Sequence, residues 1–544
     1  MNKDNFKSRS TVYSNNGIVC STSPQAASTG INILSSGGNA YDAAIAVAAV
    51  ECVTIPGMCG FGGEVFSIFY DAKTGITRGL TSTGAAPKQA TSEYFISKGF
   101  SSMPDTGPLS VSPPGELAAY KYINENYGTL KLADLIGPAI NFAENGHPIS
   151  PRAGKVFQDS KNRLKQFPSS AKIFLKPDGN VYKEGDLFKN NDLANTLKFI
   201  RDNGIDSFYK GEIAEKIIKE FKSAGGILDK DSFLNQKVEV YEPIITNYRG
   251  YTVAENRPPS QGMLLLEMLN IVENFDLSSY EHLDPNSIHL MIEAKKRAFA
   301  DRNHYLADTK IKDVPLEILI SKEFAKVRKS TIDINNASLD INPGPIISEG
   351  TDTSYFCIID KEGNAVSFIH SLYSGFGSAF VAEGTGIVFN NRQQGFRLNE
   401  PKHPNNIEPG KRPMHTLNAY IVLKENKPII ISGTPGADFQ PQGNLQIITS
   451  IIDYNLDPQQ AIDSPRWYSI PGTHPPEINN PYLIQVEPNM PKYVTDILSK
   501  KGHSITWGQE GISHGIVQLI CVDQKAGIFA GASDPRGDGY AAAL

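Results

Sequence analysis

Residues 351–371 constrain the fold of this chain more than any other segment, because they have the pattern of two short β-strands joined by a tight turn. Residues on each side of a Lys-Glu-Gly sequence alternate with a period of two, which is typical of strands. A three-residue turn with Gly363 in the left-handed conformation would pair Asp360 with Asn364. The segment therefore predicts a β-hairpin with a defined register.

The same register places Thr353, at the start of the first strand, opposite Ser371. A threonine hydroxyl is a weak nucleophile and needs an adjacent base. An α-amine, with a pKa of about 7.7–8.0, can be that base within the same residue. The amine is free only if the Asp352–Thr353 bond has been cut, and the Thr353 hydroxyl can make that cut by attacking the preceding carbonyl. Two hypotheses stay open for this segment alone, namely a self-generated N-terminal nucleophile or an ordinary hairpin with a surface threonine.

The composition is typical of a soluble globular protein, with 40% hydrophobic and 20% charged residues among 544. This length exceeds one ordinary domain of about 100–200 residues, but a four-layer α/β unit can contain it. The formal charge of −6 argues against a nucleic-acid partner. No apolar run is long enough to span a membrane, so we expect no membrane partner. The first 20 residues are polar and lack the apolar core of a secretory signal, and we therefore expect a cytoplasmic protein.

Rival chemistries find little support in the sequence. The five cysteines are scattered and no H-E-x-x-H is present, so neither a metal site nor any cofactor is expected. No G-x-S-x-G elbow exists. Ser169-Ser-Ala-Lys172 has the S-x-x-K spacing of penicillin-recognising enzymes. However, Lys73-Thr-Gly75 precedes this motif instead of following it, and no Ser-Asp-Asn lies between them.

Periodicity and turn residues predict mixed secondary structure. The segment 101–115, with four prolines, is expected to be an irregular loop, and the polar segment 309–349 a tether whose end could move after cleavage. Asp301 and Arg302 are expected to form a solvated or interdomain ion pair. The main helices are expected at 24–36, 40–53, 193–202, 213–224, 261–275, 285–307 and 445–454, and strands at 65–70, 250–253, 418–423 and 428–432.

Several motifs, in order over most of the chain, resemble the γ-glutamyltransferase family of N-terminal-nucleophile hydrolases. The opening motif is Ser23-Pro-Gln-Ala-Ala-Ser-Thr-Gly-Ile-Asn-Ile-Leu-Ser-Ser-Gly-Gly-Asn-Ala-Tyr-Asp-Ala-Ala44. The others are Gly60-Phe-Gly-Gly63, the Ala-Asp-Arg helix within 289–307, Gly375-Phe-Gly-Ser378, Gly384-Thr-Gly-Ile-Val-Phe-Asn-Asn391 and Gly433-Thr-Pro-Gly436.

The resemblance implies an α+β fold, a four-layer αββα sandwich built from two chains after self-cleavage. The large subunit would be residues 1–352, helix-rich with part of the central sheets, and the small catalytic subunit residues 353–544. Thr353 matches the family's processing and catalytic threonine, and Ser371 its supporting hydroxyl. Gly436 and Ala437 match the pair whose N–H groups form the oxyanion hole, the alternative being a plain β-turn. Gly60 to Gly63 is expected to be closely packed backbone beside the active site, not a phosphate cradle.

The residues expected to bind the substrate depart from the γ-glutamyl pattern. Thr83 stands where an arginine would hold the α-carboxylate, and Tyr373 replaces the family's Asn. Arg392 and Gly395 replace its Gln and Asp, and His415 and Thr416 replace its pair of Ser residues. His415 has the alternative of a surface turn residue. Arg392 could bind a carboxylate through a bidentate contact. γ-Glutamyl recognition should be weakened, because a partner for the amine is missing.

These features together favour an autoprocessing amide hydrolase or acyltransferase. It would transfer a γ-glutamyl or similar acidic acyl group from a small-molecule amide to water or an amine through a Thr353 acyl-enzyme. The sequence also resembles the oxamate amidohydrolase-like branch, which leaves an amidohydrolase of short acidic amides as an alternative. An inactive binding protein on the same fold is a third possibility.

Overall fold

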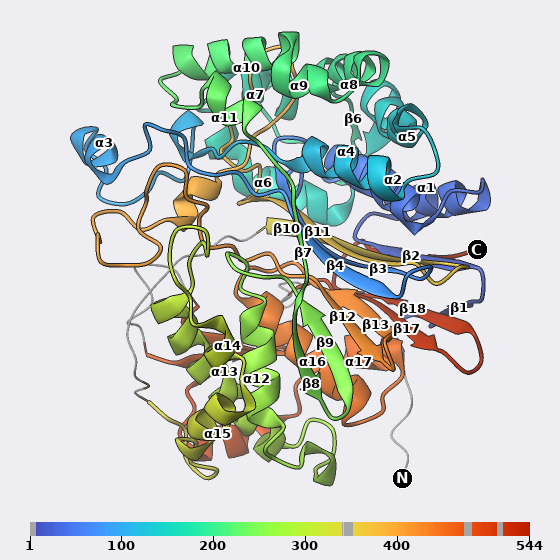
Figure 1. The fold of residues 1–544 in the computed structure, drawn as a ribbon, viewed down its shortest axis with the longest axis vertical. Coiled ribbons are helices and arrows are strands. Elements are labelled where there is room, and N and C mark those ends of the chain that lie inside the picture. The colour runs from blue at the N-terminus through green and yellow to red at the C-terminus, as the bar shows by residue number, and fades with distance from the viewer. Residues whose placement is uncertain (1–6, 340, 342–351, 473–480, 509–514) are drawn as a thin grey trace.

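The computed structural model describes residues 7–339, 341, 352–472, 481–508 and 515–544 of the 544-residue chain. Within these residues, two seven-stranded sheets stack on one another, and helices cover the outer face of each (Figure 1). The layers follow the order helix, sheet, sheet, helix. The predicted four-layer αββα sandwich is confirmed.

The first sheet carries β10 (Asp352–Asp360) in its interior, and its strand order is β19-β2-β10-β11-β3-β4-β7. The β10–β11 turn has the predicted form, because Asp360 N donates to Asn364 O at 3.2 Å and Gly363 has φ 86°. The other strands are β2 (Gly17–Ser21), β3 (Glu64–Asp71), β4 (Ile76–Thr81), β7 (Glu239–Tyr241), β11 (Ala365–Tyr373) and β19 (Tyr540–Ala543).

The second sheet has the order β1-β18-β17-β13-β12-β9-β8, and neighbouring strands are antiparallel in both sheets. Both sheets combine strands from before and after the Asp352–Thr353 bond. The strands of the second sheet are β1 (Val12–Ser14), β8 (Ile244–Tyr248), β9 (Tyr251–Glu255), β12 (Tyr420–Lys424), β13 (Lys427–Gly433), β17 (Gln518–Asp523) and β18 (Ile528–Ser533).

Alternation along β10 and β11 decides which layer each side chain enters. Tyr355 and Ile369 pack between the two sheets, with Ile431 of the second sheet. Phe356 and Phe368 instead pack against the helices of the first layer. The odd-numbered positions of this hairpin therefore face the second sheet, and the even-numbered positions face the helices.

Helices cover the outer faces in two groups (Figure 1). On the first sheet, α2 (Ala40–Thr54) is buried along its whole length, and its many alanines allow close packing with α1 (Pro24–Ser35) and α5 (Leu132–Asn145). On the second sheet lie α12 (Met263–Val272), α13 (Pro285–Tyr305) and α16 (Phe439–Ile452).

The remaining elements extend these layers. The short strands are β5 (His147–Pro148), β6 (Leu187–Phe188), β14 (Trp467–Ile470), β15 (Leu483–Val486) and β16 (Ile505–Trp507). The α-helices are α3 (Ser92–Ser97), α4 (Glu116–Tyr127), α6 (Pro151–Leu164), α7 (Pro168–Phe174), α8 (Asn191–Asn203), α9 (Asp206–Lys210), α10 (Glu212–Ser223), α11 (Lys230–Leu234), α14 (Leu316–Leu319), α15 (Lys322–Ser330), α17 (Pro458–Asp463) and α18 (Lys492–Lys500). The 3₁₀ turns are η1 (Pro108–Ser110), η2 (Leu277–Ser279) and η3 (Arg392–Gly395).

Two sequence expectations need correction. Helix α16 begins at Phe439, not at 445, because a proline in the first turn needs no hydrogen-bonded N–H. The tether expected at 309–349 is wrong for its described part, since α14 and α15 occupy much of it and α15 packs on α12. The end of that segment, 342–349, lies outside the described residues.

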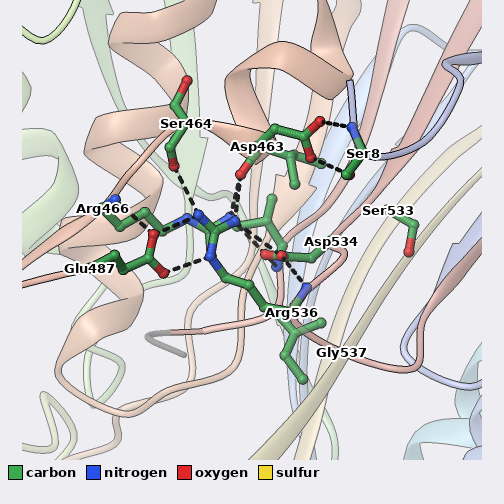
Figure 2. A network of polar contacts seen from close by, with 12 residues as sticks. Ser8, Asp463, Ser464, Arg466, Glu487, Ser533, Asp534, Arg536 and Gly537 are labelled. Atoms are coloured by element: carbon green, nitrogen blue, oxygen red, sulfur yellow. Dashed lines mark hydrogen bonds and ion pairs between the residues drawn. The ribbon is translucent and has the colours of Figure 1, made fainter. Parts of the chain in front are cut away.

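A buried charge network fixes the C-terminal part of the second sheet (Figure 2). Arg466 and Arg536 both pair with Asp534, at 2.6 Å and 3.2 Å, and Arg536 also pairs with Glu487 at 2.6 Å. Asp534 Oδ2 accepts from the N–H of Val517 at 2.8 Å. The network thereby holds the segment 515–517, and Gly515 of this segment packs against Gly436.

In the part of the chain that the structure describes, no helix combines the length and the apolar character that crossing a membrane requires.

Candidate active site

The two hydroxyl residues of the hairpin lie side by side at one end of the first sheet. β10 and β11 pair with Ser354 opposite His370, and a bulge falls between Asp352 and Ser354. The Thr353 and Ser371 Oγ atoms are 3.2 Å apart. The predicted register is confirmed. The alternative of a surface threonine is wrong, because Thr353 is only 3% exposed. Of Asp352 the structure describes the backbone, which pairs with Tyr373.

Strained and closely packed backbone holds Ser371 in place. Tyr373 has φ 87°, and its N–H donates to Ser371 Oγ at 2.8 Å. A bulky residue in this region costs about 1–3 kcal/mol and often marks a functional site. On the other side, a Cβ at Gly63 would lie 2.5 Å from the Ser371 carbonyl oxygen. The expectation of closely packed glycine backbone at this place is therefore confirmed.

A buried polar cluster continues this row across β3. Glu64 stands directly opposite Ser371 in the β3–β11 ladder. Its Oε1 accepts from Arg392 Nε and lies 3.1 Å from His415 Nε2, off the line of a good hydrogen bond. Its Oε2 accepts from Thr83 Oγ1 at 2.8 Å. Burial alone would raise the pKa of Glu64, but the charge of Arg392 and the contact with His415 lower it to about 2.

Arg392 presents two unused donors in this cluster. Its guanidinium carbon lies 4.2 Å from the centre of the Tyr373 ring, and the side chain is fully buried. Nε is held by Glu64, whereas Nη1 and Nη2 have no hydrogen-bond partner among the described residues. Two parallel N–H groups of a fixed guanidinium match the two oxygens of a carboxylate.

His415 is buried beside Glu64, so the alternative of a surface turn residue is wrong. Its ring packs on Phe66 with 4.5 Å between centroids, and its Nδ1 accepts from Leu417 N at 3.3 Å. Burial and then the charge of Arg392 lower the pKa of His415 to about 4. The neighbouring Thr416 is also buried, and its carbonyl accepts from Gln261 Nε2 at 2.8 Å.

Acid should destabilise the protein partly through His415. A histidine titrates near 6.5 when unfolded, so a folded pKa of about 4 gives a contribution that is complete above 6.5 and lost as pH falls toward 4. Between pH 7 and pH 5 the loss should be about 2 kcal/mol. We expect His415→Asn to show a smaller drop in melting temperature over this interval than wild type. An equal drop in both proteins would contradict the assignment.

The turn after β13 has the features of an anion-binding turn. Gly436 and Ala437 have φ 121° and 48°, and the turn leads directly into α16. Among the described residues no acceptor takes the N–H of Gly436 or of Ala437. Gly433, three residues earlier, packs on the ring of Tyr355, which shares the face of β10 that carries Thr353. Free N–H groups before a helix N-terminus favour a negatively charged oxygen.

An ion triad lies on the opposite face of the hairpin, behind the two hydroxyls. His370 forms hydrogen bonds through Nε2 with Glu51 Oε2 and through Nδ1 with Glu116 Oε1, both at 2.8 Å. Glu51 Oε2 also accepts from Ser354 Oγ at 2.6 Å. Burial would lower the pKa of His370, but the charge of Glu116 and the contacts with Cys52 and Glu51 raise it well above its usual value. Glu51 thereby joins neighbouring residues of β10 and β11 beside Thr353.

Sequence reasoning missed this triad and also Glu64. The available signal was a single acidic residue within an otherwise apolar segment, as in Ala-Val-Glu51-Cys and Gly-Gly-Glu64-Val. Such a residue must find a buried partner. The partners of Glu51 and Glu64, however, come from distant parts of the chain.

Glu51→Gln should slow the formation of the two fragments by about tenfold or more, because Ser354 and His370 lose their shared carboxylate. Glu116→Gln is the matched control, since Glu116 contacts His370, whereas the Ser354 hydroxyl donates to Glu51. We expect similar losses of melting temperature in both variants but slower cleavage mainly in the first, as followed by denaturing electrophoresis. Equal cleavage rates in the two variants would refute the proposed role of Glu51.

Within the described part of the chain, two groups of donor atoms lie close enough to hold a metal, and we assign a metal to neither. In the group Cys52, Cys59 and His370, both ring nitrogens of the histidine are bound by carboxylates. In the group His289, Glu293 and His503, the carboxylate already pairs with Lys296 and Arg297. These nearby cations would repel a metal ion.

The fold and the paired hydroxyls at the start of an interior strand define the class of N-terminal-nucleophile hydrolases. A family model described as gamma-glutamyltranspeptidase matches residues 26–544, and the chain belongs to that family. It is 36% identical to the glutathione hydrolase-like YwrD proenzyme of Bacillus subtilis, over 95% of this chain and 97% of that one. It is 29% identical to the oxamate amidohydrolase proenzyme of Klebsiella pneumoniae, over 97% and 98% of the two chains.

The solved structure of cephalosporin acylase from Bacillus halodurans superimposes with a TM-score of 0.92 at 36% identity, and covers 100% of this chain and 99% of that one. The chain is therefore an autoprocessing amide hydrolase or acyltransferase of this family. Membership of this family supports the interpretation of the chain as an enzyme and not as an inactive binding protein.

Proposed function

We propose that Thr353 is the nucleophile and that it is released by self-cleavage. Its Oγ attacks the carbonyl carbon of Asp352, the C–N bond breaks, and the nitrogen leaves as the amine of Thr353. Water then hydrolyses the ester, which restores the hydroxyl and leaves a carboxylate on Asp352. The support is the burial of Thr353 at the bulge and its contact with Ser371.

In the mature enzyme, the Thr353 amine takes the proton of its own hydroxyl as Oγ attacks the substrate amide. Ser371 Oγ, held by the Tyr373 N–H, hydrogen-bonds to the nucleophile. The N–H groups of Gly436 and Ala437 stabilise the oxyanion, a contribution of about 2.7–4 kcal/mol for one donor. The acyl group then passes from Thr353 to water or to an amine. Fragments 1–352 and 353–544 stay associated as a heterodimer.

We further propose that the acyl group carries a carboxylate bound by Arg392, with Tyr373, His415 and Thr416 around it. The observation that carries this proposal is the pair of buried, unpartnered donors Nη1 and Nη2. Glu64, the carboxylate beside Arg392, uses both oxygens for Arg392, His415 and Thr83. An α-ammonium group would compete with these contacts. The geometry therefore favours an acidic acyl group without an amine over γ-glutamyl.

Three matched substrates test this proposal. Glutaryl p-nitroanilide and γ-glutamyl p-nitroanilide differ only in the α-amino group, and butyryl p-nitroanilide lacks the carboxylate. We expect the highest kcat/KM for the glutaryl compound and the lowest for butyryl. Equal rates for glutaryl and butyryl would refute a carboxylate site. Release of ammonia from oxamate, with no turnover of the anilides, would favour the oxamate-type alternative, the reaction named for the Klebsiella relative.

A further inference from the structure

Two side chains from the first 352 residues hold the turn that carries Gly436 and Ala437. Gln261 Nε2 donates to the carbonyl of Ala437 at 2.9 Å and to that of Thr416 at 2.8 Å. Arg302 Nη1 donates to Asp438 Oδ1 at 2.6 Å and also to Gln261 Oε1. Gln261, Arg302 and Asp438 are all buried. The expectation of a solvated or interdomain ion pair between Asp301 and Arg302 is wrong, because both are buried and each pairs with another residue, Arg302 with Asp438 and Asp301 with Arg328.

The backbone of Gln261 is fixed independently of its side chain. Its N–H donates to the carbonyl of His415 at 2.9 Å, and His415 N donates to that of Pro259 at 2.8 Å. The preceding residue, Ser260, donates through Oγ to the carbonyl of Leu417 at 2.6 Å. The Gln261 amide thus starts from a rigid attachment and bridges two separate pieces of the second fragment, Thr416 and Ala437.

The turn needs such support, because its conformation is not the one its sequence prefers. Ala437 is in the left-handed region, which costs about 1–2 kcal/mol for a residue with a Cβ. A hydrogen bond to its carbonyl fixes the plane of the Ala437–Asp438 peptide, and the Arg302–Asp438 pair fixes the next residue. These contacts hold the peptide unit that follows Ala437, and they thereby restrict the two preceding units, Pro435–Gly436 and Gly436–Ala437, whose N–H groups have no acceptor among the described residues.

We propose that Gln261 and Arg302 are positioning residues that aim the N–H groups of Gly436 and Ala437 at the reacting carbonyl. The inference rests on the proposed function, because it takes these N–H groups as the oxyanion donors. It assigns to the first fragment a part in the chemistry of the second. Both act through the turn, because Gln261 Nε2 binds the carbonyls of Thr416 and Ala437 and Arg302 Nη1 binds Asp438 and Gln261.

Loss of this support should lower kcat more than it changes KM, because an oxyanion forms only as the carbonyl is attacked. In Gln261→Met the side chain keeps a similar length and loses both donors. We expect kcat to fall by about 10–100-fold and KM to change less than threefold, since small misplacements of catalytic groups have effects of this size. Arg302→Lys keeps the charge but not the forked geometry, and we expect a similar fall in kcat.

Arg297→Lys is the matched control, because Arg297 is also a buried arginine of α13. Its side chain binds Glu293 and Thr331 and not the residues of the turn. We expect it to lower the melting temperature and leave kcat unchanged. The double variant Gln261→Met/Arg302→Lys should lose no more than about the larger single effect, because both residues act on one turn.

The experiment uses the full chain, with cleavage checked by denaturing electrophoresis before kinetics on whichever of the three anilides the wild type hydrolyses fastest. Gln261→Glu, which removes both donors and keeps an acceptor for Arg302, serves if Gln261→Met fails to fold. A kcat within twofold of wild type in cleaved Gln261 variants would overturn the inference, as would an equal loss in Arg297→Lys. Either result leaves Thr353 as nucleophile intact, whereas an active Thr353→Ala would remove the proposed function itself.

Discussion

Replacement of Thr353 by alanine should leave the protein as one 59.3 kDa chain and abolish amide turnover. Without Oγ no ester can form at the Asp352 carbonyl, and without cleavage no free amine is available as base. Loss of a nucleophile in comparable enzymes reduces kcat by about 10⁶-fold, which falls below detection here. Denaturing electrophoresis and intact mass measure the first effect, and release of p-nitroaniline measures the second.

Thr353→Ser provides the control, because it keeps a hydroxyl in the same position beside Ser371. We expect it to cleave at the same bond, more slowly, and to retain activity. Two outcomes count against the assignment. One is cleavage of Thr353→Ala between residues 352 and 353, and the other is an active wild-type fragment whose N-terminus is not Thr-Ser-Tyr-Phe.

Arg392→Met should reduce kcat/KM for the glutaryl substrate by about 10²–10³-fold, mainly through a higher KM, because the carboxylate loses a buried bidentate partner. Activity on butyryl p-nitroanilide should change little. The same substitution also leaves Glu64 buried without its main countercharge, which costs about 3–5 kcal/mol of stability. Thermal unfolding and steady-state kinetics separate the two effects.

The double variant Glu64→Gln/Arg392→Met removes both charges of the pair. We expect it to recover much of the melting temperature while the glutaryl substrate remains poor. Recovery of glutaryl turnover together with stability would show that Arg392 is only a structural partner of Glu64. Arg412→Met offers a further comparison, since Arg412 is a buried arginine paired with Asp308 and Glu239. Its loss should lower stability without changing the ratio of glutaryl to butyryl turnover.

The sequence allowed much of the hairpin and the nucleophile pair to be predicted, because both depend on local rules. A period of two and a glycine turn define the register, and the register alone brings Thr353 to Ser371. The start of α16 was missed because Pro441 and Gly443 usually oppose a helix, although both are tolerated here near its beginning. The Glu64–Arg392 pair was missed for another reason. Its members are 328 positions apart, and no local pattern encodes such a contact.

The way the two fragments share strands has a consequence for how the mature enzyme is made. β10 lies between β2 and β11, and β12 lies between β9 and β13. Each sheet therefore contains strands from both sides of the Asp352–Thr353 bond. Separating the halves would break five strand pairings of the described sheets, namely β19–β2, β2–β10 and β11–β3 in the first sheet and β1–β18 and β9–β12 in the second. We therefore expect the two fragments of one precursor to stay together and not to exchange with fragments of other molecules. Mixed isotopically heavy and light preparations should yield no hybrid dimers under native conditions.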